Sequence, residues 1–267
     1  NGSFPVTPGA FQTNFRNGVG GVDEDLARDA TIYKVSSDGK TLIYATYLGG
    51  THNEEPHSMV VNSRDELIVF GTTFSNNFPV SANAFDNSFN GVADIFVFVL
   101  SADGKSMIGS TFIGGTGVDG LNGDANPAGT PLAYNYGDQY RGEVIVDGND
   151  DIYVATSTRS AVGFPVKNAF QNTIAGGQDG CVFKLNQDVT NLVWSSYLGG
   201  PAVDVCNGLD LDSKGNVLVA GGTTSGLSFM TSGMGETTSY QGGVGDGFMV
   251  KIAPNGNQIL NATYVGT

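Results

Sequence analysis

The chain has 267 residues, with 12 Lys and Arg against 26 Asp and Glu, which gives a formal net charge of −14. A protein this acidic lacks the basic face that binds nucleic-acid phosphates or an anionic membrane surface, so we expect neither partner. Glycine occurs 40 times while apolar residues still make up 40% of the chain, and this combination favours many short strands and tight turns over a disordered linker. Membrane insertion is not expected, because no stretch approaches the ~18–20 apolar residues of a membrane helix.

The first unit, residues 1–50, carries a connector motif and two predicted strands. The connector is Phe4-Pro5-Val6, and the strands are expected near 31–35 and 41–48. The Asp38-Gly39 pair between them favours the positive φ angles of a tight hairpin. The second strand ends in Leu48-Gly49-Gly50. This unit is predicted to supply only the outer two strands of a sheet.

Three further units repeat the same elements, each with four predicted strands. They cover residues 51–115, 116–199 and 200–267, and the middle one carries a long insertion over 116–140. Strands such as Ile95 to Leu100 are apolar on both faces, which predicts sheets buried on both sides. A four-stranded antiparallel sheet between like neighbours is a propeller blade. We therefore expect an all-β propeller with fourteen strands, or about three and a half blades.

A propeller of this size is expected to need further blades, since closed rings have about four to eight. Two copies of the chain would each contribute outer strands to the half blade and neither would contribute the inner pair. The 267 residues are therefore predicted to be part of a longer polypeptide or a larger assembly.

The repeated motifs resemble the SBBP family, the seven-bladed β-propeller repeats of bacterial exported proteins. The motifs are the Phe-Pro-Val connector, the Tyr-Leu-Gly-Gly strand end (Tyr197 to Gly200) and an Asp-x-x-Val-x-Lys-Leu strand, with an Asp ahead of the strand in each unit: Asp29, Asp94, Asp179 and Asp246. The resemblance implies a non-catalytic module of an extracellular, cell-surface protein that makes protein–protein or adhesive contacts. Some such proteins resemble adhesins sorted by a type IX C-terminal secretion signal.

The insertion is the predicted binding surface, because it sets exposed tyrosines among Gly, Asn and Asp, the composition of recognition loops. Its candidate residues are Tyr134, Tyr136, Tyr140, Asp119 and Asp124. The alternative is that the tyrosines fold back over neighbouring blade edges. The same loop offers oxygen ligands for calcium at Asp119, Asn122, Asp124, Asn126 and Asp138. No other cofactor is expected.

The histidines and cysteines do not predict a metal or catalytic site. His52 and His57 lie with two glutamates in a loop that Pro56 keeps from being helical, so a polar loop is favoured over a metal site. Cys181 and Cys206 are either a lone bridge or two buried thiols. No concentrated catalytic set is visible. Two alternatives to the adhesive module stay open: a glycan-active enzyme using acids on the propeller face, and a purely structural spacer.

Overall fold

The computed structural model describes residues 4–16, 28–123, 132–133, 138–227 and 235–266. These residues form fourteen strands and a 3₁₀ turn over Asp138–Tyr140. Within the described ranges no helix is long and apolar enough to cross a membrane. The strands are β1 (Ala30–Val35), β2 (Leu42–Leu48), β3 (Glu54–Val61), β4 (Leu67–Thr73), β5 (Asp94–Leu100), β6 (Met107–Ile113), β7 (Glu143–Val146), β8 (Ile152–Thr158), β9 (Asp179–Leu185), β10 (Leu192–Leu198), β11 (Asp204–Leu211), β12 (Val217–Thr223), β13 (Asp246–Ile252) and β14 (Ile259–Val265).

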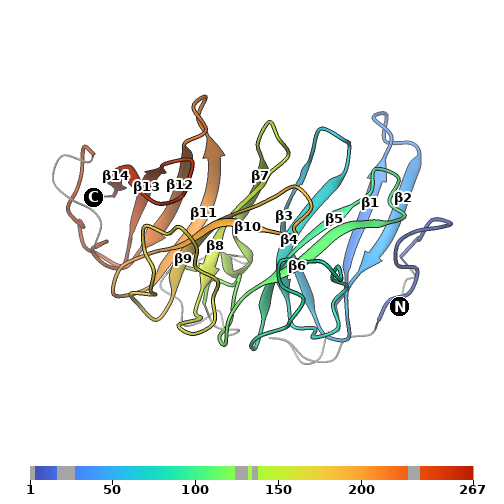
Figure 1. Ribbon diagram of the computed structural model, residues 1–267, viewed down its shortest axis with the longest axis horizontal. Coiled ribbons are helices and arrows are strands. Elements are labelled where there is room, and N and C mark those ends of the chain that lie inside the picture. The colour runs from blue at the N-terminus through green and yellow to red at the C-terminus, as the bar shows by residue number, and fades with distance from the viewer. Residues whose placement is uncertain (1–3, 17–27, 124–131, 134–137, 228–234, 267) are drawn as a thin grey trace.

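The strands form one two-stranded and three four-stranded antiparallel sheets. The orders are β1-β2, β3-β4-β5-β6, β7-β8-β9-β10 and β11-β12-β13-β14. The sheets stand side by side in an open arc, from β1 and β2 at the blue end to β13 and β14 at the red end (Figure 1). The first strands of the complete sheets meet, because β7 contacts both β3 and β11. This confirms the predicted all-β propeller blades.

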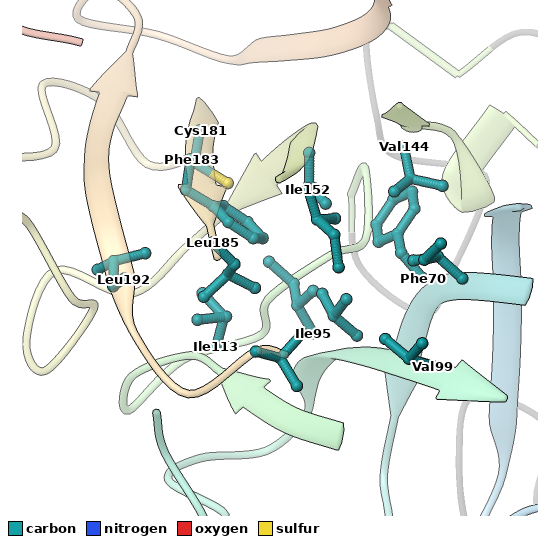
Figure 2. Close-up of a cluster of buried hydrophobic side chains, with 14 of the residues drawn as sticks. Phe70, Ile95, Val99, Ile113, Val144, Ile152, Cys181, Phe183, Leu185 and Leu192 are labelled. Carbon is teal, nitrogen blue, oxygen red and sulfur yellow. The ribbon is translucent and has the colours of Figure 1, made fainter. Parts of the chain in front are cut away.

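The core lies between neighbouring sheets. Every residue of β4, β5 and β8 is buried, which confirms that both faces of the sheets are covered. Between the second and third sheets, Phe70 and Ile95 face Ile152 and Phe183 (Figure 2). Burial of such apolar area stabilises a fold by roughly 25 cal/mol per Å².

The Phe-Pro-Val connectors anchor the outer edges of the sheets. The Phe78 ring lies 4.6 Å from that of Phe96, and the Phe164 ring lies 5.2 Å from that of Tyr197. Both connector rings are buried. The repeated motif therefore places a buried aromatic ring against the outer strands of the blade.

Candidate functional site at the interrupted innermost strand

The insertion interrupts the innermost strand of the third sheet. Asp119 forms an antiparallel bridge with Thr158, as Glu54 does with Thr73 in β3. The strand then resumes at Glu143, so β7 has four residues where β3 has eight. Residues 116–119 are thus part of the blade and not of the insertion, which corrects the predicted boundary. The sequence signal is the shared spacing from the second glycine of each Gly-Gly pair to an acid.

Asp119 is buried and fully engaged within the blade. Its Oδ2 accepts hydrogen bonds from the Ser160 hydroxyl at 2.7 Å and the Gly115 amide at 2.8 Å, and its Oδ1 accepts one from the Thr158 hydroxyl. Burial raises the pKa of this carboxyl, while these donors act against the shift. The prediction that Asp119 lies on an exposed binding surface is wrong, because the spacing to Gly115 gives it the structural role that Glu54 has in β3.

Asn122 anchors the start of the insertion to Gln178, the residue before β9 of the same blade. Its side-chain carbonyl accepts a hydrogen bond from Gln178 Nε2 at 3.0 Å, and its amide group donates one to the Leu132 carbonyl at 3.1 Å. Gln178 also accepts from the Gly123 amide at 2.7 Å. Asn122 is 2% exposed. Its predicted role as an open calcium ligand is therefore not the one the structure gives it.

Tyr140 closes the insertion against β3. Its ring lies 6.2 Å from that of His57, which in turn packs edge-on against Phe70 at 5.1 Å. Both ring nitrogens of His57 are buried with no hydrogen-bond partner among the described residues, and burial lowers the pKa of His57 to about 3. His57 is thus a neutral packing residue. For Tyr140 the alternative of folding back over a blade edge is the one observed.

Of the remaining predicted site residues, only Asp138 lies within the described residues. Asp138 begins the 3₁₀ turn that ends at Tyr140. Four of them lie outside the described residues: Asp124, Asn126, Tyr134 and Tyr136. Among the residues that the structure does describe, no group of three or more His, Cys, Asp or Glu could hold a metal ion. Calcium binding by the insertion stays a prediction.

A comparison with protein families identifies the repeat. Residues 193–228 match the family model of SBBP, a beta-propeller repeat. This segment is similar to an SBBP repeat. It covers nearly all of β10 and the whole of β11 and β12, so it joins the outer edge of one blade to the inner pair of the next. No curated protein matches the chain.

The junctions beside the Gly-Gly motifs of the first two sheets also hold a pair of acids each. The backbone of Gly114 passes so close that a methyl group there would lie 2.2 Å from Asp94 Oδ1 and 3.1 Å from Asp119 Oδ2. At Gly49 the corresponding pair is Asp29 and Glu54. Sequence reasoning noticed the first acid as a repeated position but missed that Glu54 and Asp119 pair with it. The first glycine is needed because only a residue without a side chain fits beside both carboxyls.

Burial raises the pKa values of the paired carboxyls. Burial, with a smaller effect of Asp119 and Asp86, raises the pKa of Asp94 to about 7. Burial likewise raises the pKa of Glu54 to about 7 and that of Asp204 to about 6. One oxygen of Asp94 and one of Asp204 are buried with no hydrogen-bond partner in the described part of the chain. These acids recur at equivalent repeat positions, which marks them as scaffold.

The acids of the SBBP-type inner turns are structural as well. Asp147 Oδ1 accepts hydrogen bonds from the amides of Asn149 and Asp151, at 2.8 and 3.1 Å. Its other oxygen lies 3.1 Å from Lys184 Nζ. Asp212 shapes the next turn in the same way and pairs with Lys251. Equivalent geometry in two blades supports a turn role over a catalytic one.

Both cysteines are free and buried. Of the two alternatives, buried thiols are therefore correct and the lone bridge is not. Burial raises the pKa of both thiols, which makes them poor nucleophiles.

Proposed function

We propose that this chain is a non-catalytic propeller module of an exported bacterial cell-surface protein and that it mediates protein–protein or adhesive contacts. One observation carries the proposal: among the three four-stranded sheets, the innermost strand is continuous in β3 and β11, whereas an insertion interrupts the innermost strand of the sheet of β7 between Asp119 and Glu143. The acids with raised pKa values serve every blade alike, which argues against a unique catalytic role.

The insertion suits recognition because its described ends are held rigidly. Asn122 and Gln178 hydrogen-bond to each other within one blade, Gln178 also donates to the Asp204 carbonyl of the next blade, and Tyr140 packs against β3. Loops longer than about 12–15 residues on a compact repeat are usually functional or disordered. Tyr134 and Tyr136 are of the residue type that recognition loops favour for aromatic contacts.

The exposed face of the last sheet supports a larger ring. Met249 is 53% exposed, whereas Val97 and Val182 at the same register position of β5 and β9 are fully buried by the following sheet. A further blade of the same type would cover Met249 in the same way. We therefore include assembly with further blades in the proposed function.

The adhesive role is tested by excising the insertion. In the variant, Gly120 is joined to Glu143 through the two residues Pro-His that lie between Glu55 and Ser58 in β3. Wild type and variant are incubated in solution with a panel of immobilised polysaccharides (cellulose, chitin, mannan and alginate) and with intact bacterial cells. We expect wild type to be retained and the variant to lose at least tenfold in binding at unchanged thermal stability.

The controls separate the alternatives. Replacing Tyr134 and Tyr136 together by alanine should reproduce the loss of binding, while Asp210→Asn on exposed β11 should not. Equal retention of the excised variant, or no retention of wild type on any surface, would favour the structural spacer. Release of reducing sugars from the panel would favour the glycan-active enzyme. Proteolytic shaving of intact producing cells tests the predicted surface location.

A further inference from the structure

In the first sheet, one edge of β1 is unpaired among the described residues, whereas the equivalent edge is paired in the complete sheets. In the complete sheets the third strand pairs on both sides, as β5 does with β4 and β6. Among the described residues β1 pairs with β2 alone. Its inward edge therefore presents backbone donors and acceptors of the kind that accept an added strand.

A hollow lies beside this edge. It measures about 370 Å³ and runs between β1 and the start of the next sheet. Its lining includes Ile32 and Tyr33 from β1, and His57 and Met59 from β3. In the other junctions this place is filled, because β11 packs against β7, β8 and β9 of the sheet before it. At the first junction the counterparts of β7 and β8 are missing from the described residues.

Met59 shows what the missing strands would cover. Met59, Val144 and Leu209 occupy the same register position, opposite Val69, Val154 and Val219. Val144 is 1% exposed and Leu209 is 9% exposed, but Met59 is 69% exposed. The residues are alike in chemistry and differ only in whether the preceding sheet has an inner pair. Exposed apolar surface of this kind marks an interaction site.

We propose that the hollow between β1 and β3 binds a partner β-hairpin of the SBBP inner-pair type, whose second strand pairs with the free edge of β1. The inner hairpins of the described sheets are not the occupant, because each is already part of its own sheet. A second copy of the chain is not the occupant, because the second strands of its own inner hairpins, β4, β8 and β12, are each already paired with a third strand. The inference rests on the larger ring of the proposed function but not on the adhesive role.

The complete blades also define the chemistry of that hairpin. Its second strand must be apolar on both faces, as in β4, where all seven residues are buried. It should end in a threonine, because Thr73 donates to Glu54 at 2.8 Å and Thr158 donates to Asp119.

The cis test supplies such a hairpin in the correct register. A second copy of residues 51–77 replaces residues 1–3, so that it meets Phe4-Pro5-Val6 as the original meets Phe78-Pro79-Val80. We expect hydrogen exchange of the β1 amides to slow at least tenfold and peroxide oxidation of Met59 to fall by a similar factor. Met249, which is 53% exposed on the far sheet, is the internal control and should oxidise at an unchanged rate.

The trans test adds a synthetic peptide of residues 200–224, the β11–β12 hairpin, to the unmodified chain. Saturable protection of Met59 is expected, and it should be abolished by Val219→Pro in the peptide, which removes a strand amide, or by Met59→Glu in the chain. Met249→Glu should leave binding intact. Unchanged β1 exchange and Met59 oxidation in both tests would overturn the proposal. Protection of Met59 by dimerisation without peptide would also overturn it, in favour of a second copy.

Discussion

At the junction between the second and third sheets, the Val189 side chain occupies the space that a side chain at Gly109 would need. A methyl group on Gly109 would lie 2.8 Å from Val189 Cγ2, and Val189 is fully buried at a φ of 52°. The other two junctions use the opposite sizes, with a turn glycine against an aromatic ring of the preceding outer strand. These pairs are Gly104 with Tyr44 and Gly256 with Trp194.

Because the large and small residues are exchanged at this junction, we expect the effects of substitutions at Gly109 and Val189 on the free energy of unfolding to be strongly coupled. Gly109→Tyr alone should overpack against Val189 and cost about 1–3 kcal/mol or more. Val189→Gly alone should leave a cavity, partly offset by relief of the left-handed backbone. The double variant restores the pairing seen at the other junctions. Double-mutant analysis of urea unfolding should show a favourable coupling of roughly 1–3 kcal/mol, and strict additivity would contradict this account.

Glycine at the turns should matter in proportion to the aromatic beside it. Gly39 and Gly256 have φ angles of 72° and 75°, but nothing lies within 4 Å of a methyl group at Gly39, while Trp194 lies 2.2 Å from one at Gly256. Gly39→Ala should cost about 1 kcal/mol for the left-handed backbone. Gly256→Ala should cost several times more, as measured by urea unfolding. Similar costs would show that backbone strain alone sets the requirement.

The carboxyl pairs predict that stability falls as pH rises. Because burial raises the pKa of Asp94 to about 7, the folded chain holds a proton that the unfolded chain releases near pH 4. The folded state therefore binds more protons between roughly pH 4 and pH 7, and stability declines across that range. Glu54 and Asp204, with pKa values raised to about 7 and about 6, act in the same direction.

Asp94→Asn isolates this effect. The amide keeps an oxygen for the hydrogen bond that Asn90 donates to Asp94 at 2.9 Å, and it carries no charge. The variant should raise the thermal midpoint more at pH 8 than at pH 4. Asp210→Asn on the exposed part of β11 serves as the control and should show no such difference. A midpoint gain independent of pH would point to altered packing instead.

The two thiols should not react with alkylating reagents in the folded chain. Cys181 and Cys206 are fully buried and burial raises the pKa of both, so the reactive thiolate is scarce. Iodoacetamide at pH 8 should leave the native mass unchanged and add two groups after denaturation. Rapid labelling of either cysteine under native conditions would place that residue on an open surface.

The blades could be predicted from the sequence because their signals are local. Runs such as Ile95 to Leu100 are apolar on both faces, and Asp38-Gly39 or Asn255-Gly256 mark the hairpins between strands. Strand identity and order depend on neighbours within one unit, and repetition strengthens each assignment. The candidate site was less predictable: Tyr140 lies on the insertion as expected, but Asp119 and Asn122 have structural partners that its composition does not reveal.

Tertiary structure decided everything that depends on residues far apart in the chain. Asp94 meets Asp119, and Gly109 meets Val189, only because sheets pack face to face. Met59 is exposed while Val144 is buried because one preceding sheet has an inner pair and the other does not. Periodicity reports which face of a strand is apolar, whereas the partner of that face is set by how the sheets are arranged.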